Sequence, residues 1–509
     1  MTPSENVMPV AGLLVIDSVT VLTSLSPAIA IRGELTVGNP SQLVLRGSRQ
    51  TICCDIVVTG SRWSATVPLL NSVWGGPLLP PRSGRYVVIA SDATGAPLAI
   101  EVDAELPAPQ LIEGATRVFF DDLEDGLDVR FAAPLSDRER GPLQQAALEA
   151  DYRSARLDPI NAVFFESFYG QNASCNPRAI DRELARLRPD ITRYWSVADA
   201  SVEVPPGAVA LIDGSADWWR IRGSARLLVV NDWLRNRFRK RPFQTVLQTW
   251  HGTMLKKLAL SRLRLGLRPA LATLRERARW DILLAQNPYS TNVFRSAYAF
   301  LGPVWQEGYP RDDVLLTGDA RAVRRRLGIA DEVTVLLYAP TWRDDRPDHV
   351  DHLDVSRFAQ SLGDGYVTLI RGHSRTLLPG ENLRAKNVLD VTGYPDISEL
   401  FLVADALITD YSSVMFDFTV TGKPLFFFTP DIVHYREKLR GFYFDLSAVA
   451  PGPLVSSPDE LVALVRDRDA VRARYDDKYR AWQRRFNPRD DGGAAERVVR
   501  RLLEEQVIG

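Results

Sequence analysis

Ten short apolar runs between residues 162 and 428 constrain the fold of this chain most strongly. The first series is Ala162–Phe165, Arg226–Val230, Thr245–Thr249, Ile282–Ala285 and Val304–Glu307, and the second is Val333–Tyr338, Tyr366–Ile370, Val388–Val391, Ala406–Thr409 and Leu425–Phe428. Helix-prone sequence separates the runs, a pattern typical of parallel α/β sheets. Two series joined near residues 310–330 predict two Rossmann-like lobes with a cleft between them.

The chain has 509 residues, too many for one hydrophobic core, so we expect several domains. Residues 10–105 contain short alternating runs separated by turn residues, which predicts a small antiparallel β-sandwich. A further strand pair is expected at Thr116–Phe120 and Leu127–Phe131. The predicted domains are a sandwich-like β module with this strand pair (1–132), a helical linker (133–158), the first lobe (159–316), the second lobe (317–480) and a C-terminal helix (481–509).

Composition excludes several classes of protein. Hydrophobic residues make up 45% of the chain and charged residues 25%, as in soluble globular proteins. The net charge of -1 gives no general attraction to nucleic acid, and three cysteines do not form a disulfide framework. No apolar stretch is long enough to span a bilayer, and Met1–Pro9 has no basic residue that would favour a secretory signal. We therefore expect a cytoplasmic protein whose attachment to a membrane surface stays possible.

His251 lies in Gln248-Thr-Trp-His-Gly-Thr253, directly after a predicted strand. The carboxyl ends of parallel strands are where ligands bind, and histidine exchanges protons near neutral pH. His251 could therefore accept a proton from an attacking hydroxyl group. The alternative is a structural histidine that hydrogen-bonds a nearby carbonyl group.

The second lobe has its own polar residues after predicted strands. His373 follows Leu369-Ile-Arg-Gly372, where His373, Arg371 or Arg375 could neutralise a diphosphate, or could form only a basic surface loop. In Asp410-Tyr-Ser-Ser413, Ser412 and Ser413 could bind a phosphate group or could simply cap a helix. Asp410 and Asp417 could accept hydrogen bonds from sugar or glycerol hydroxyl groups.

Two turns are less specific. Thr341 and Arg343, in Tyr338-Ala-Pro-Thr-Trp-Arg343, could meet an anionic ligand or only form a turn. Gly308-Tyr-Pro-Arg-Asp-Asp313 falls at the expected connection between the lobes, where a hinge is as reasonable as a binding site.

The segment from Lys256 to Arg279 is basic and rich in leucine. It has eight basic residues, among them Lys256, Lys257, Arg262 and Arg264, against the single acidic residue Glu276. Leucines recur through it, at Leu255, Leu258, Leu260, Leu263, Leu265, Leu267, Leu271 and Leu274. This pattern suits contact with an anionic membrane or a polyanionic acceptor, or a solvated helix whose leucines pack on their own lobe. No nucleic-acid-binding module accompanies the charge.

Several motifs between Asn161 and Leu446, in this order, resemble those of the CDP-glycerol glycerophosphotransferase family of teichoic-acid polymerases and primases. They are Phe165-Glu-Ser-Phe-Tyr-Gly170 with Asn176-Pro177, Gln248-Thr-Trp-His-Gly-Thr253 with Lys256-Lys257, Gly308-Tyr-Pro-Arg-Asp-Asp313, Tyr338-Ala-Pro-Thr-Trp342, Asp410-Tyr-Ser-Ser-Val414 with Phe416-Asp417, and Arg440-Gly-Phe-Tyr-Phe-Asp445. The resemblance implies an α/β GT-B-like fold and transfer of a polyol phosphate from a CDP-activated donor to an acceptor hydroxyl, with release of CMP.

The resemblance also implies roles for individual residues. His251 would be the general base, and His373, Ser412, Ser413 and Asp417 would hold the donor, with Arg440 as a further phosphate contact. Expected partners are CDP-glycerol or a similar CDP-polyol, a lipid-linked polyol-phosphate acceptor and the inner face of the cell membrane. No metal or other cofactor is expected, and no oligomeric state is predicted.

The motifs are compatible with glycerol, ribitol or another polyol as the transferred group. They are equally compatible with a primase or a polymerase, and with teichoic acid or capsule as the product. Two other functions are compatible with the same residues: a GT-B glycosyltransferase that uses a nucleotide sugar, and a non-catalytic protein that binds envelope polymers.

Overall fold

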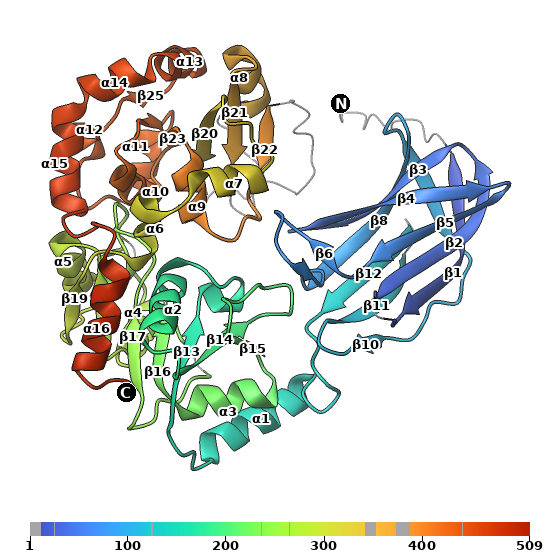
Figure 1. The fold of residues 1–509 in the computed structure, drawn as a ribbon, viewed down its shortest axis with the longest axis horizontal. Helices are drawn as coiled ribbons and strands as arrows, with labels where there is room; N and C mark the ends of the chain where they lie inside the picture. The colour runs from blue at the N-terminus through green and yellow to red at the C-terminus, as the bar shows by residue number, and fades with distance from the viewer. Residues whose placement is uncertain are drawn as a thin grey trace. The chain divides into compact units, whose positions relative to one another are not determined.

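The computed structural model describes residues 12–509 except 25, 124–125, 236, 264, 342–352, 373–386 and 440 (Figure 1). The chain divides into two compact units. The first runs to Gly141 and includes Ala198–Glu203, and the second contains both predicted lobes.

The main sheet of the first unit is mostly antiparallel and closes on itself. Seven strands form the ring, because β9 pairs with both β1 and β8. In ring order they are β8 (Gly84–Asp92), β3 (Pro40–Gly47), β4 (Thr51–Thr59), β5 (Arg62–Pro68), β2 (Ala28–Val37), β1 (Leu13–Leu22) and β9 (Pro97–Val102). Three more extend the sheet from β8, namely β12 (Gly126–Ala132), β11 (Thr116–Leu123) and β10 (Gln110–Ile112), and β6 (Asn71–Ser72) and β7 (Leu78–Leu79) form a separate hairpin.

The closed ring corrects the predicted sandwich. Alternating inward and outward residues occur in sandwiches and barrels alike, so the sequence pattern does not distinguish them. β9 pairs in parallel with β1 and antiparallel with β8, and these two pairings close the sheet into a barrel. The interior is filled by apolar side chains that include Leu14, Ile31 and Trp63.

The first lobe is a seven-stranded parallel sheet. Its strand order is β15 (Val209–Ile212), β14 (Thr192–Val197), β13 (Ile160–Glu166), β16 (Ala225–Val230), β17 (Thr245–Gln248), β18 (Ile282–Ala285) and β19 (Val304–Gln306). The main helices of this lobe are α2 (Cys175–Leu187), α3 (Ala216–Ser224), α4 (Leu267–Arg277) and α5 (Pro288–Ala297). The chain order reverses between β13 and β16, so their carboxyl ends form a topological switch point, where ligands bind in such sheets.

Strands β14 and β15 are not among the predicted runs. In β14, Arg193 and Tyr194 interrupt the apolar pattern. The structure accommodates the charge because Arg193 Nη1 lies 3.0 Å from Asp181 Oδ2 of α2, and both side chains are less than a tenth exposed. A buried ion pair of this kind is invisible in a hydrophobicity pattern. All five strands predicted for this lobe are present, with ends that differ by two residues at most.

The second lobe is a six-stranded parallel sheet. Its order is β22 (Val388–Asp390), β21 (Tyr366–Ile370), β20 (Thr334–Ala339), β23 (Ala406–Thr409), β24 (Leu425–Phe428) and β25 (Leu454–Val455). Its helices include α7 (Ala320–Arg326), α8 (Val355–Leu362), α9 (Ile397–Val403), α10 (Val414–Phe418), α13 (Pro458–Arg466), α14 (Arg468–Arg474) and α15 (Asp476–Phe486). The switch point here lies between β20 and β23. The two lobes together have the α/β, GT-B-like organisation that the sequence predicts.

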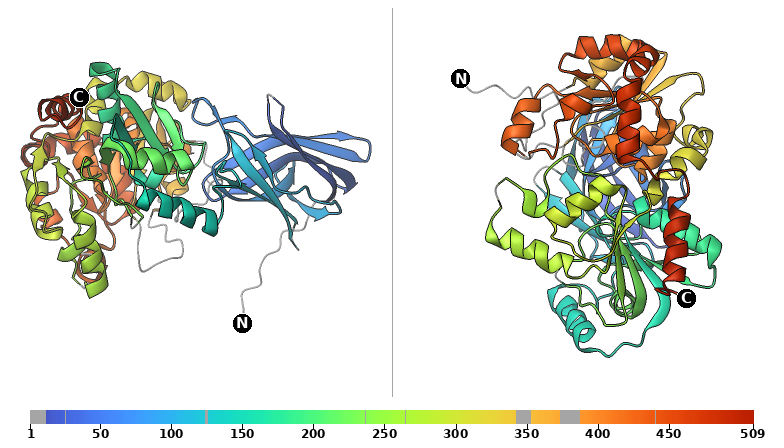
Figure 2. Two further views of the ribbon diagram at one scale, coloured as in Figure 1. Left: turned by 90° about the horizontal axis from the view of Figure 1, so that it is seen from below. Right: turned by 90° about the vertical axis from the view of Figure 1, so that its left-hand side faces the viewer.

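The chain crosses between the lobes twice. The first crossing contains α6 (Val314–Thr317), and the second leads from α15 to α16 (Ala494–Glu504). Helix α16 packs against α2, beside the green strands of the first lobe (Figure 2). The remaining helices are α1 (Pro142–Ser154), α11 (Ile432–His434) and α12 (Leu446–Val449). Within the described residues, no helix combines the length and hydrophobicity needed to cross a bilayer.

Candidate functional site

His251 lies in the loop after β17, residues 249–253, here called the His251 loop. Its Nδ1 is 2.6 Å from the carbonyl oxygen of Asn231, which follows β16. Because a carbonyl oxygen can only accept, Nδ1 carries the hydrogen, and in the neutral ring Nε2 keeps a lone pair. The ring stacks on Trp250, with centroids 4.9 Å apart, and contacts Phe168 at 5.5 Å.

Burial is the main cause that lowers the pKa of His251 below its ordinary value; the charge of Asp232 and the Asn231 carbonyl partly oppose it. A lowered pKa keeps the imidazole neutral near pH 7, the form that accepts a proton. The structural hydrogen bond of the alternative interpretation is thus present, but it uses only one ring nitrogen. His251 can be held in place and still act as a base.

The loops around His251 contain an unusual concentration of left-handed backbone. Non-glycine residues with positive φ are strained and cluster at functional sites. Among the nine such residues in the described parts of the chain, six lie in the segments that follow β13, β16 and β17, where Cys175 is the first residue of α2: Phe168 (47°), Tyr169 (56°), Cys175 (65°), Arg235 (60°), Trp250 (54°) and Ala259 (42°). The strained backbone therefore lies after the same strands as His251, the predicted base.

The corresponding loop of the second lobe contains residues 410–413 and is called the Ser412 loop. Asp410 is buried and accepts hydrogen bonds from the backbone N–H of Thr341, at 2.9 and 3.0 Å to its two oxygens. It thereby joins the loops after β20 and β23 across the switch point. Ser412 and Ser413 are only half-buried, and the Ser413 side chain makes no capping hydrogen bond to α10. Helix capping therefore does not account for Ser413.

The His251 loop and the Ser412 loop approach each other closely at Gly252. A Cβ atom on Gly252 would lie 2.8 Å from Ser413 Oγ and 3.0 Å from Ser413 Cβ. Real Cβ atoms do not approach other heavy atoms so closely, so glycine permits this contact between the lobes. The predicted base and one of the predicted phosphate-binding serines therefore lie on adjoining loops.

We expect Gly252→Ala to lower the free energy of unfolding by about 1–3 kcal/mol, because the added methyl group overpacks the contact with Ser413. Chemical denaturation measures this. Gly365→Ala is the control, because a Cβ there has no heavy atom within 4 Å. The cost should shrink when Ser413 is also changed to glycine; an equal cost with and without the Ser413 side chain would contradict the contact.

Of the four basic residues predicted to contact the acceptor or the membrane, Lys256 and Lys257 lie where the two lobes meet. Lys256 forms an antiparallel bridge with Phe442, and the N–H of Lys257 donates to the Gly441 carbonyl at 3.0 Å. The segment that begins with these lysines therefore pairs with the second lobe through its backbone. Arg262 is exposed, and Arg264 lies outside the described residues.

The remaining predicted donor contacts are placed differently. Arg371 donates through Nη1 to the carbonyl groups of Val391 and Tyr394, at 3.3 and 2.7 Å. Burial lowers its pKa to about 10. Arg371 thus ties its own loop to the segment after β22. His373 and Arg440 lie outside the described residues, as do Arg343 and Arg375.

Asp417 does not face solvent. Its Oδ2 forms an ion pair of 2.6 Å with Nη2 of Arg311, in the turn that precedes the first crossing, and both side chains are less than a tenth exposed. The buried Asp312 and the half-buried Asp490 lie beside this pair, where both accept hydrogen bonds from Nε2 of Gln286 at 3.0 and 2.8 Å. Burial, followed by the charges of Asp417 and Asp490, raises the pKa of Asp312 well above its usual range. Arg311 is not among the residues predicted to form the site, although it lies in the motif Gly308-Tyr-Pro-Arg-Asp-Asp313.

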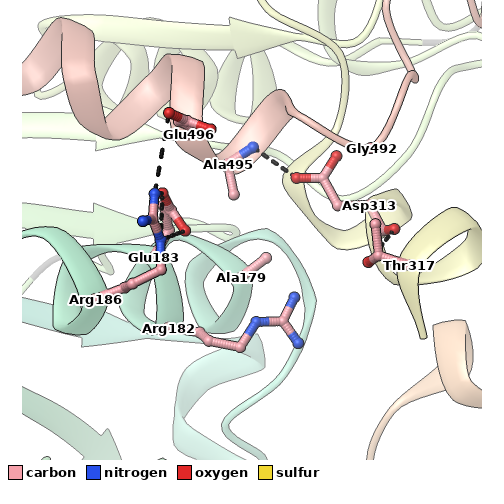
Figure 3. A pocket seen from close by; sticks show the side chains of 9 residues that line it. All are labelled: Ala179, Arg182, Glu183, Arg186, Asp313, Thr317, Gly492, Ala495 and Glu496. Atoms are coloured by element: carbon pink, nitrogen blue, oxygen red, sulfur yellow. Dashed lines mark hydrogen bonds and ion pairs between the residues drawn. The ribbon is translucent and has the colours of Figure 1, made fainter. Parts of the chain in front are cut away.

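A separate cavity of about 490 Å³ lies between α2, the first crossing and the start of α16 (Figure 3). It is lined by Ala179, Arg182, Glu183, Arg186, Asp313, Thr317, Gly492, Ala495 and Glu496. None of the predicted site residues borders it. Asp313 accepts hydrogen bonds from the N–H groups of Ala494 and Ala495, which fixes the start of α16. In the described parts of the chain, no three histidine, cysteine or acidic side chains are grouped so that they could hold a metal ion.

Comparison with known proteins gives consistent results. The family described as CDP-Glycerol:Poly(glycerophosphate) glycerophosphotransferase matches residues 152–504. The chain is 36% identical over 367 residues to the teichoic acid poly(glycerol phosphate) polymerase of Bacillus subtilis (strain 168). This match covers 68% of this chain and 49% of that protein. The chain is also 33% identical over 377 residues to the teichoic acid glycerol-phosphate transferase of Staphylococcus aureus (strain NCTC 8325 / PS 47). This second match covers 69% of this chain and 95% of that protein.

A solved structure of the wall teichoic acid polymerase TagF aligns with a TM-score of 0.66 and 33% identity, over 71% of this chain and 94% of that chain. A TagF variant soaked with CDPG aligns with a TM-score of 0.65 and 34% identity, over 71% of this chain and 92% of that chain. The chain spans about half the length of the Bacillus subtilis relative. The matched family region begins at residue 152 and so excludes the β-barrel unit.

Proposed function

Because the chain belongs to the CDP-glycerol:poly(glycerophosphate) glycerophosphotransferase family, we propose that it transfers glycerol phosphate from CDP-glycerol to a terminal hydroxyl group of a teichoic-acid-like polymer. The observation that carries the proposal is the approach of the His251 loop to Ser413 at Gly252. If His251 is the base and the serine hydroxyl groups bind phosphate, as we propose, this approach supports the reaction by bringing the two functions together. A related polyol phosphate is the alternative substrate.

In the proposed reaction the acceptor hydroxyl oxygen attacks the β-phosphorus of the donor. The new P–O bond forms as the bond between this phosphorus and the bridging oxygen breaks, and CMP leaves with that oxygen. Nε2 of His251 takes the proton of the attacking hydroxyl, since Nδ1 is already engaged with Asn231.

Charge on the phosphate oxygens is stabilised by donors that are fixed before the reaction, which is the main contribution of proteins to phosphoryl transfer. We assign this role to the hydroxyl groups of Ser412 and Ser413. Asp410 and Thr341 would act by holding the Ser412 loop, because the carboxylate of Asp410 is directed to the Thr341 backbone. His373 and Arg440 stay predicted donor contacts.

Purified protein incubated with CDP-glycerol and a lipid-linked glycerol-phosphate acceptor should release CMP and lengthen the acceptor by phosphorus-containing units. A product without added phosphorus would instead indicate a glycosyltransferase. Acceptor binding without any CMP release would indicate a polymer-binding protein. Parallel reactions with CDP-ribitol identify the polyol.

We further propose that the enzyme works at the inner face of the cell membrane and contacts it through α4 and the preceding segment. Four leucines there are exposed: Leu263 (55%), Leu267 (85%), Leu271 (52%) and Leu274 (36%). Others, such as Leu255, are buried, so the leucines divide between the core and the surface. One face of α4 carries three of them, because Leu267, Leu271 and Leu274 are spaced four and three residues apart. Positive charge in the same segment comes from Arg262, Arg268 and Arg275. This combination is typical of helices that lie on anionic membranes.

The double variant Leu267→Ser/Leu271→Ser should bind phosphatidylglycerol vesicles at least about tenfold more weakly, because burying one leucine contributes about 1.5–3 kcal/mol. Vesicle sedimentation measures the partition. Leu143→Ser, at an 82% exposed leucine on α1, is the matched control and should bind normally. Equal binding by the double variant and the parental protein would rule out this surface.

A further inference from the structure

Two buried side chains hold three successive carbonyl groups of the His251 loop. Nδ2 of Asn176 donates to the carbonyl oxygens of Thr249 and Trp250, at 3.3 and 3.2 Å. Nη1 of Arg311 donates to the carbonyl oxygen of His251 at 3.0 Å. Asn176 and Arg311 are called the carbonyl clamp. Their bonds fix the peptide planes on both sides of Trp250, whose φ of 54° needs such support.

The two members of the clamp also hold each other. Asn176 is fully buried at the start of α2, and its Oδ1 accepts the backbone N–H of Arg311 at 3.2 Å. One amide side chain therefore connects the His251 loop to the turn that carries Arg311. All donors and acceptors of the Asn176 side chain serve this connection, so its role is to position backbone.

Arg311 continues the connection into the second lobe. Its Nη2 pairs with Oδ2 of Asp417 at 2.6 Å, while Nη1 binds His251. Asp417 lies on α10, four residues after Ser413. The side chains of Arg311 and Asp417 are 6% and 2% exposed, so water screens the pair little. A single guanidinium group thus joins the backbone of the predicted base to the helix that follows the predicted phosphate-binding serines.

We propose that Arg311 is a positioning residue that sets the imidazole of His251 relative to the Ser412 loop, and that Asp417 acts through Arg311 as the fixed point in the second lobe. This inference rests on the proposed transfer reaction. Its physical basis is the planar fork of arginine, which binds two acceptors in fixed directions at once. A misplacement of about 1 Å in such a geometry can cost about 100-fold in rate.

Arg311→Lys tests the proposal most sharply, because it keeps the positive charge that Asp417 needs and removes the fork. We expect kcat to fall about 10- to 100-fold, with the KM for CDP-glycerol changed less than about threefold. Arg193→Lys is the matched control, since Arg193 also forms a buried ion pair in the first lobe, with Asp181 at 3.0 Å. The control should lose stability and keep its kcat. Asp417→Asn should lower kcat in the same way as Arg311→Lys.

A second readout does not depend on turnover. In histidine-labelled protein, the Nδ1 proton of His251, which donates to the Asn231 carbonyl, should shift or broaden in Arg311→Lys and stay unchanged in Arg193→Lys. If the parental protein released no CMP, the proposed function would be refuted. The signal of the Nδ1 proton would still test the carbonyl clamp in that case. A kcat within about threefold of the parental value, together with an unchanged Nδ1 proton, would overturn the positioning role of Arg311.

Discussion

His251→Ala is expected to slow CMP release about 10²- to 10⁴-fold while the protein still binds CDP-glycerol, because general-base catalysis contributes rate enhancements of this size. His251 is assigned to the acceptor hydroxyl, so its removal should affect kcat far more than the dissociation constant of the donor. Steady-state CMP release and donor titration by calorimetry measure the two quantities separately.

The pH dependence of CMP release by the parental protein provides a further check. The base must be neutral, so activity is lost as the pH falls through the pKa of His251. Because burial lowers this pKa, the acid limb of kcat/KM should lie below the value of about 6.5 for an unperturbed histidine. In His251→Ala this limb should disappear. An unchanged limb, or residual activity within about tenfold of the parental enzyme, would assign the base to another group.

Ser412→Ala and Ser413→Ala should each weaken donor binding about tenfold or more. A hydrogen bond from a hydroxyl group to a charged phosphate contributes about 1.5–3 kcal/mol, which corresponds to at least about a tenfold change in Kd. The double variant should lose more than either single variant. Calorimetry with CDP-glycerol, and with CMP for comparison, measures the loss.

The matched control for the serines is Ser361→Ala, in the same lobe. Ser361 lies on α8, where its hydroxyl donates to the Arg357 carbonyl on the exposed face of the helix. It should bind CDP-glycerol as tightly as the parental protein. If both loop serines can be replaced without loss of affinity, they do not bind the donor phosphates and the donor must be held elsewhere.

Much of the second unit could be predicted from the sequence because its strands are short, apolar and buried on both faces. β18 and β23 are fully buried along their length and match the predicted runs at both ends. Once the strands are parallel, their carboxyl ends must share one edge of the sheet. The positions of His251 and of Ser412 at strand ends follow from that, before any side-chain contact is known.

Contacts between distant segments could not be predicted in this way. Arg311 and Asp417 are 106 positions apart, and hydrophobic periodicity contains no information about such a pair. Donor binding by Asp417, which its place near the serines and the family resemblance both suggest, stays a prediction, and the sequence gives no sign that its carboxylate pairs with Arg311. Closure of the β-barrel depends likewise on β9, a strand of six residues that pairs with two partners.

The most direct test of the central claim follows the β-phosphorus of the donor. CDP-glycerol labelled with ³²P at that position is incubated with the parental protein, with His251→Ala and with a lipid-linked acceptor. Attack at phosphorus predicts label in the lengthened acceptor, unlabelled CMP, and almost no transfer by His251→Ala. Label recovered in CDP, with an unlabelled acceptor, would contradict the account, because it would mean that a carbon–oxygen bond had been broken instead.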